Sequence, residues 1–137
     1  MSQYLTEKQK KLFQIKKTSY GLGLFAKKDI AKGTYVVEYS GEKISNEEGD
    51  RRVGRYLMIY DDNFMLDGKS RSNIGRYVNH ACKPNCTTYF ENKKIRFYSI
   101  KNIKAGEELT FDYGKEYFDA YIKPFGCRCA SCLKNTM

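Results

Sequence analysis

The sequence predicts a mainly β fold with few short helices. Short runs of β-branched and aromatic residues recur, separated by turn signals about every 8 to 12 residues. The clearest runs are 35–39, 56–60, 64–66, 87–90 and 95–100. No stretch keeps a helical period for more than about ten residues. The 137 residues suit a single domain, and we find no linker, low-complexity segment or tandem repeat.

The first half of the chain contains one strong strand between weaker elements. Residues 1–11 are polar and predict a frayed start or a short helix, and 12–16 predict a first strand. Residues 20–26 hold two glycines followed by an apolar run, for which we expect a tight turn that lets the backbone approach a ligand closely. Residues 35–39 are the clearest strand, and 45–48 have the form of a capped helix start.

The second half predicts two hairpins and a late strand. The hairpins turn at 61–63 and at 91–94, between short apolar runs. A strand at 109–114 follows a glycine turn. Two turns share one form, Ile-Ala-Lys-Gly at 30–33 and Ile-Lys-Ala-Gly at 103–106.

The formal net charge is +9, with 25 lysines and arginines against 16 aspartates and glutamates. A basic surface favours anionic partners, so non-specific contact with nucleic acid is one expectation, and a merely solvated face is the other. No apolar run approaches the roughly 20 residues that span a bilayer. Residues 1–14 also lack the apolar core of a signal peptide. We therefore expect no membrane partner and an intracellular protein, in the cytoplasm or the nucleus.

Five cysteines in a reducing compartment are more often metal ligands or free thiols than disulfides. Three of them form a C-x-C-x-x-C tail, which predicts a zinc site because zinc takes four sulfur or nitrogen ligands. Three unrelated thiols are the alternative. The tail consists of Cys127, Cys129 and Cys132, and the candidates for a fourth ligand are Cys82, Cys86 and His80.

The only histidine, His80, suits a general base, a metal ligand or a structural hydrogen-bonding group. The chain has no second histidine and no nucleophile elbow, so a hydrolytic triad lacks support. Asn79 beside it can both donate and accept, which suits an amino-acid-like ligand. The glycine pair at 21 and 23 is not G-x-G-x-x-G, so a dinucleotide site is not expected and a plain turn stays open.

Strand alternation places Phe111 and Tyr113 on one face and Asp112 on the other. With Tyr56, these rings could line a narrow aromatic channel. Such a channel attracts a cationic or methylated amine by cation–π interaction. An ordinary core strand is the alternative.

Taken in order, five segments resemble the SET domain of protein lysine methyltransferases. They are Gly21 to Ala26, Glu38 to Glu42, Arg76 to Asn85, Gly106 to Gly114 and the cysteine tail. The resemblance runs from Leu12 to Leu133. It implies a polar N-terminal segment at 1–11, a SET domain at 12–118 and a post-SET zinc-binding tail at 119–137. It also implies small curved sheets with a pseudoknot, in which the Asn-His segment and the C-terminal strand cross.

The resemblance implies S-adenosylmethionine as methyl donor, one structural zinc ion and a protein lysine as acceptor. Cofactor-binding residues would be Tyr20, Gly21, Leu22, Gly23, Tyr56, Arg76, Asn79, His80 and Tyr113. Catalytic residues would be Tyr113, Tyr56 and Phe111. Zinc ligands would be Cys82, Cys127, Cys129 and Cys132, which leaves Cys86 as a free thiol.

The expected function is therefore protein-lysine N-methylation, with histone lysine as substrate. Phe111 carries no hydroxyl to pin a water or restrain the amine, so we expect di- or trimethylation. The alternatives are a SET-like module that binds chromatin or another partner with little catalysis, and a small zinc-dependent nucleic-acid binder. The compact chain suits a microbial or viral member, monomeric or homodimeric, which would act in the host nucleus if its source is a pathogen. Ala81 and the short C-x-C-x-x-C tail depart from the usual family pattern.

Overall fold

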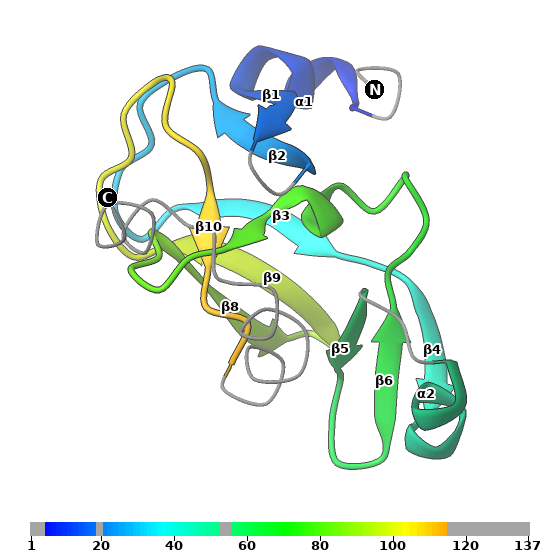
Figure 1. The fold of residues 1–137 in the computed structure, drawn as a ribbon. Helices are drawn as coiled ribbons and strands as arrows, with labels where there is room; N and C mark the ends of the chain where they lie inside the picture. Colours follow the sequence, from blue (N-terminus) through cyan, green and yellow to red (C-terminus); the bar gives the residue numbers. More distant parts are fainter. Residues whose placement is uncertain (1–4, 19–20, 53–55, 115–137) are drawn as a thin grey trace, which may run out of the picture.

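The computed structural model describes residues 5–18, 21–52 and 56–114, and Figure 1 shows their arrangement. Strands dominate and the helices are short, so the predicted mainly β fold is confirmed. None of the helices in these three ranges is long and apolar enough to cross a membrane. The elements in chain order are α1 (Glu7–Leu12), β1 (Phe13–Thr18), β2 (Gly21–Ala26), β3 (Tyr35–Tyr39), β4 (Glu42–Ser45), α2 (Asn46–Arg52), β5 (Leu57–Ile59), β6 (Phe64–Asp67), the 3₁₀ helix η2 (Ile74–Tyr77), β7 (Asn79–His80), β8 (Cys86–Glu91), β9 (Lys94–Ser99) and β10 (Thr110–Phe111).

The strands form small sheets rather than one large one. β1 pairs with β2, β7 pairs with β10, and two three-stranded sheets have the orders β3-β9-β8 and β4-β6-β5. Both predicted hairpins are present, as β5–β6 and β8–β9. The second hairpin turns through Asn92 and Lys93, whose φ angles of 51° and 61° are left-handed. Asparagine tolerates this conformation better than most residues.

The start of the chain contains a short capped helix followed by a hairpin. Thr6 and Gln9 form a capping box at the first turn of α1, which satisfies two backbone N–H groups. The glycine pair at 21 and 23, for which a tight turn was predicted, instead lies in strand β2, in antiparallel register with β1. The prediction of a turn was therefore wrong here, because pairing with β1 stabilises an extended backbone. Gly21 keeps a left-handed φ of 117°, which favours glycine.

One hydrophobic core joins these sheets. Its fully buried side chains include Phe97 from β9 and Leu24 from β2. In β9 the alternate residues Ile95, Phe97 and Ser99 are buried, as a sheet with one covered face requires. Leu109 and Ile103 bring the C-terminal part of the described chain into the same core.

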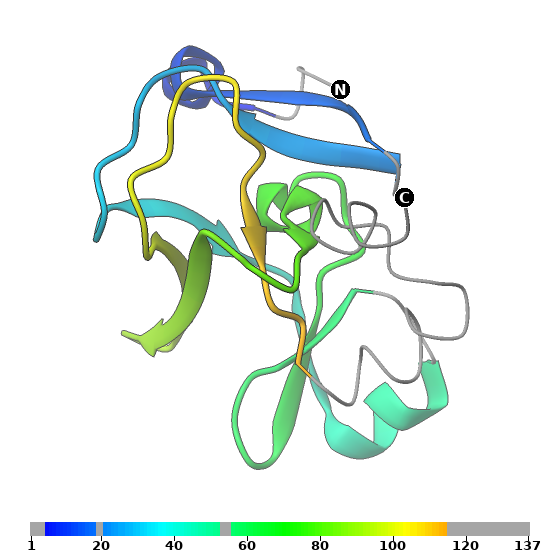
Figure 2. The same ribbon diagram turned by 60° about the vertical axis from the view of Figure 1, so that its left-hand side comes forward.

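The two turns of similar sequence lie side by side in Figures 1 and 2. Ile30 and Ile103 exchange both backbone hydrogen bonds, at 2.7 and 2.8 Å. Gly33 and Gly106 have left-handed φ angles of 85° and 94°. The two turns of similar sequence, 30–33 and 103–106, are therefore paired in the structure and join the first and last thirds of the described chain.

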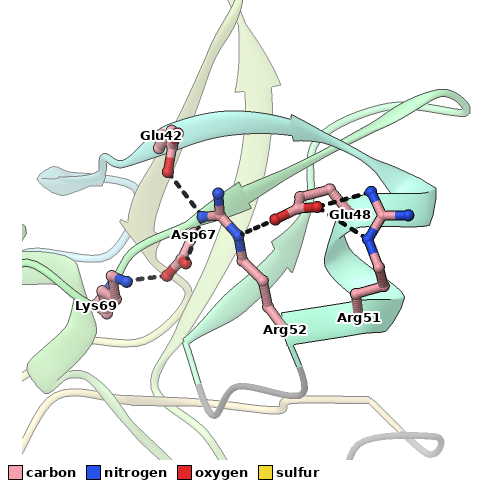
Figure 3. Close-up of polar contacts among 6 residues, drawn as sticks. All are labelled: Glu42, Glu48, Arg51, Arg52, Asp67 and Lys69. Atoms are coloured by element: carbon pink, nitrogen blue, oxygen red, sulfur yellow. Dashed lines mark hydrogen bonds and ion pairs between the residues drawn. The ribbon is translucent and has the colours of Figure 1, made fainter.

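Helix α2 is fastened to the β4-β6-β5 sheet by charged side chains (Figure 3). The Ser45 hydroxyl accepts the Glu48 N–H at 3.1 Å, so the predicted capped start is confirmed. Arg52 contacts three carboxylates, those of Glu42 at 2.7 Å, Glu48 at 2.9 Å and Asp67 at 3.0 Å. Asp67 is buried, so this arginine compensates a carboxylate that water barely reaches.

Candidate functional site

The site is built where two distant segments cross. β7 and β10 run parallel, with Asn79 opposite Thr110 and His80 opposite Phe111. In Figures 1 and 2, β10 passes between the β1-β2 sheet and the β4-β6-β5 sheet. The expected crossing of the Asn-His segment and the C-terminal strand is present.

Asn85 holds this crossing together through its side chain. Its Nδ2 donates to the Glu108 carbonyl at 2.8 Å, and its Oδ1 accepts the Thr110 N–H at 2.9 Å. The carboxamide thus takes the place of a neighbouring strand, which satisfies two backbone groups beside β10.

An aromatic pocket opens beside the crossing. The ring centroids of Phe111 and Tyr113 lie 4.7 Å apart, and Phe97 packs edge-on beneath Phe111 at 4.8 Å. The Tyr113 hydroxyl donates to the Val78 carbonyl at 3.2 Å. The three residues predicted to be catalytic therefore line one cavity. Its lining residues are Tyr39, Tyr56, Leu57, Met58, Gly75, Arg76, Val78, Phe111 and Tyr113.

Arg76 forms part of the wall of this pocket. Its guanidinium carbon lies 4.1 Å from the centre of the Tyr56 ring and 5.4 Å from that of Tyr77. One terminal nitrogen donates to the Lys69 carbonyl. The Nε–H is buried and has no hydrogen-bond partner among the residues that the structure describes. An unpaired buried donor is costly, so the residue suits an acceptor carried by a ligand.

His80 is buried, and its side chain faces Tyr113. Its Nδ1 accepts the Tyr113 backbone N–H at 3.1 Å, and the two rings lie 5.3 Å apart. Burial lowers the pKa of His80, while nearby Asp112 acts in the opposite direction. The neutral ring keeps the lone pair that this hydrogen bond needs. The side chain therefore fixes the backbone of Tyr113, which matches the structural reading of this histidine.

The remaining predicted cofactor residues gather where β2 meets β7. Asn79 Nδ2 donates to the Leu22 carbonyl at 3.0 Å and to the Glu108 carboxylate at 2.9 Å. Gly23 is buried beside this contact, and Gly21 begins the strand. The prediction for Tyr20 lies outside the described residues.

Glu108 is a member of this group that the sequence reasoning missed. Burial raises the pKa of its carboxyl group, against the smaller effect of the hydrogen bond from Asn79. The only sequence signal is an acidic pair at 107 and 108 before a strand, and such a pair is equally typical of a solvated turn.

The predicted zinc site stays a prediction. Cys127, Cys129 and Cys132 lie outside the described residues, and within the described ranges no group of three or more metal-ligating side chains comes together. Cys82 is exposed, with its Sγ 3.6 Å from Nε2 of His80. Cys86 is in the core, where burial raises the pKa of its thiol to about 12.

Comparison with known proteins finds one matching family and several curated relatives. Residues 21–114 match the SET domain family. The chain is 36% identical over 127 residues to the histone-lysine N-methyltransferase trithorax of Drosophila virilis, which covers 84% of this chain and 3% of that protein. It is 37% identical over 124 residues to the histone-lysine N-methyltransferase EHMT1 of Mus musculus, covering 81% of this chain and 10% of that protein. The histone-lysine N-methyltransferase 2D of Homo sapiens is 34% identical over 142 residues, covering 94% and 3%. The chain thus spans a small part of the length of these relatives.

Proposed function

The chain belongs to the SET domain family, and on that premise we propose that it is an S-adenosylmethionine-dependent protein-lysine N-methyltransferase. The observation that carries the proposal is the aromatic pocket in which Tyr56, Phe111 and Tyr113 meet beside the crossing of β7 and β10. The names of the curated relatives, all histone-lysine N-methyltransferases, support the same reaction class.

The bound cofactor would supply a methyl group activated by a sulfonium cation. The buried donor on Arg76 and the polar contacts around Asn79 support a polar ligand next to the pocket. Arg76, Asn79 and the backbone of residues 20–23 would hold that ligand, together with Tyr56, His80 and Tyr113. The Arg76 Nε–H, which has no partner within the described part of the chain, fits such a ligand because the cofactor carries several acceptor atoms.

The pocket walls would prepare the lysine. A lysine amine has a reference pKa of about 10.4, so the neutral nucleophile is scarce at neutral pH. Aromatic walls exclude water and penalise the charged amine, which lowers its pKa. Tyr113 would orient the amine, because its hydroxyl is already directed by the Val78 carbonyl and its backbone by His80. Holding the amine in line for transfer supplies much of the rate.

We propose di- or trimethylation as the outcome, because Phe111 presents no hydroxyl to the pocket. Phe111 is buried and packs between Phe97 and Tyr113, so the added hydroxyl of Phe111→Tyr would stand against the amine. Mass spectrometry of the products should show the Phe111→Tyr variant shifted toward monomethyl product. If the wild type makes only monomethyl product and the variant does not differ from it, the proposal on methylation degree is wrong.

A histone tail is the proposed substrate, with action in the nucleus or the cytoplasm. A basic tail needs local acidity on a chain of charge +9. Asp61 and Asp62 are exposed and could supply it. Asp67 cannot, because it is buried against Arg52. Non-specific nucleic-acid contact and the monomeric or dimeric state stay predictions.

Zinc is proposed as a structural ion held by Cys82 with Cys127, Cys129 and Cys132. Metal analysis of the purified chain should find one equivalent, and Cys82→Ser should lower it.

Incubation with labelled S-adenosylmethionine and a panel of proteins, histones included, tests the activity. The wild type should label a histone lysine. Tyr113→Phe and Asn79→Ala should lose most of the label, whereas Tyr89→Phe, an exposed tyrosine on β8, should keep it. Absence of label on every protein would favour the alternative, a SET-like module that binds chromatin or another partner without catalysis.

A further inference from the structure

Glu108 is a partly buried carboxylate placed among the proposed cofactor residues. No ion pair to it occurs within residues 5–18, 21–52 and 56–114. Its backbone forms a β-bridge with Phe25 of β2, and the following Leu109 N–H donates to the Leu24 carbonyl at 2.8 Å. Burying a carboxylate without a cation is unfavourable, so the position calls for an explanation beyond packing.

The contact of Glu108 with Asn79 determines which way the carboxamide points. Asn79 Nδ2 lies 2.9 Å from the Glu108 carboxylate and 3.0 Å from the Leu22 carbonyl. Both of these partners are hydrogen-bond acceptors, so each needs an N–H donor. The oxygen of the carboxamide can only accept and cannot take that role. A flipped amide would set oxygen against oxygen at both contacts. The two N–H donors are therefore committed, and Oδ1 is the part of the side chain left for a ligand.

Gly23 provides the space for this pair. A Cβ at this position would lie 2.5 Å from Glu108 Oε2, 2.8 Å from Thr18 Cγ2 and 3.0 Å from Asn79 Nδ2. A real Cβ atom does not approach other atoms as closely as the first two distances, so a side chain here would displace the Glu108 carboxylate and crowd the Asn79 amide. The second glycine of the Gly-x-Gly pair thus makes room for a side-chain contact, while Gly21 serves a left-handed backbone.

We propose that Glu108 is a positioning residue of the cofactor site, which holds Asn79 so that its carboxamide oxygen receives an N–H donor of the bound cofactor. This inference rests on the proposed function. It specifies the chemistry at Asn79: the ligand group that meets this residue is a donor, such as an amino group, and not a carboxylate or a phosphate. Glu108 does not touch the reacting atoms and acts through Asn79.

Calorimetric titration with S-adenosylmethionine tests the proposal on variants whose folding is checked by circular dichroism. Glu108→Ala should raise Kd about tenfold, as expected when one hydrogen bond that orders a side chain is lost. Glu108→Gln keeps an acceptor for Asn79 and should stay within about threefold of the wild type. Glu107→Ala is the matched control, because the Glu107 side chain is exposed and accepts the Lys104 N–H of its own turn at 2.7 Å, away from Asn79.

The double variant separates positioning from direct binding. If Glu108 acts through Asn79, Glu108→Ala should change Kd little once Asn79 is already alanine. If the Kd of the double variant rises by the product of the two single fold-changes, the proposal is overturned. A folded Glu108→Ala protein with the Kd of the wild type would also overturn it. A cofactor analogue that lacks the amino group should bind the wild type and Asn79→Ala with equal Kd. If the analogue still binds the wild type more tightly than Asn79→Ala, by as much as the cofactor does, the amino group is not the donor that meets Asn79.

The side-chain amide signals of Asn79 give a second measurement without cofactor. In nuclear magnetic resonance spectra these signals should move when Glu108 titrates, and the movement should vanish in Glu108→Gln. A wild type that binds no S-adenosylmethionine would overturn both the proposed function and the role of Glu108 in it. Normal wild-type binding with amide signals insensitive to Glu108 would overturn this inference alone.

Discussion

Phe97 is the side chain on which the pocket and the core both depend, and Phe97→Leu is expected to destabilise the fold by about 2 kcal/mol. Its ring is completely buried and makes two edge-to-face contacts, with Phe111 at 4.8 Å and Tyr39 at 6.4 Å between centroids. Such pairs contribute about 0.5–1.5 kcal/mol each beyond the burial of apolar area, so losing both costs about 1–3 kcal/mol. Leucine retains most of the apolar burial, and the small space it leaves adds to the loss.

Urea unfolding followed by circular dichroism measures this change. The midpoint should fall while the slope stays constant, since the surface exposed on unfolding hardly changes. Phe90→Leu is the matched control, because this ring is 53% exposed and has one tilted partner, Tyr60, at 4.9 Å. We expect the control to cost less than about 1 kcal/mol. Equal losses in the two variants would refute the reasoning that buried ring contacts at Phe97 hold the core.

Three further predictions concern thiols, protons and charge. With a chelator present, iodoacetamide should alkylate the exposed Cys82 and spare Cys86, because burial raises the pKa of the Cys86 thiol to about 12. Equal labelling of the two cysteines in peptide maps would contradict this. Burial lowers the pKa of His80, so its contribution to the free energy of unfolding is present above the unfolded pKa of about 6.5 and is lost as pH falls below it. In urea titrations at several pH values, His80→Gln should flatten this dependence on pH. If the free energy of unfolding of the variant changes with pH as in the wild type, His80 is not the source of the dependence. Arg52→Met should lower the urea midpoint more than Arg51→Met, because Arg52 pairs with a buried carboxylate, whereas Arg51 pairs with the partly exposed Glu48. Equal shifts in the two variants would show that the contact with Asp67 adds nothing to stability.

The local parts of the fold were predictable because short-range chemistry determines them. The hairpins at 57–67 and 86–99 follow from apolar alternation around polar turns. Ser45 begins α2 as its capping chemistry predicts. The glycine pair at 21 and 23 was misread as a turn because glycines weaken a strand pattern, whereas pairing with residues 13–18 determines the outcome.

The site was predictable only where its residues belong to one segment or to a family motif. Alternation predicted that Phe111 and Tyr113 share a face and, with Tyr56, could line a channel, and the resemblance to SET domains implied their roles. The roles of Asn85 and Glu108 depend on contacts made across the crossing, and composition and periodicity do not report such contacts. The same limit applies to Asp67, whose burial against Arg52 depends on the packing of α2 on the sheet.

The crossing of β7 and β10 also determines when a binding site can exist during folding. Its two strands close a long loop, and closing long loops is entropically expensive, so such pairings form slowly and late. A growing chain that has not yet reached Thr110 has β1 to β9 available but neither the Asn85 bridge nor the Phe111 wall. Ligand affinity is therefore expected to arise in one step at the end of folding, and a cofactor present in the cell would trap the finished fold and not its intermediates.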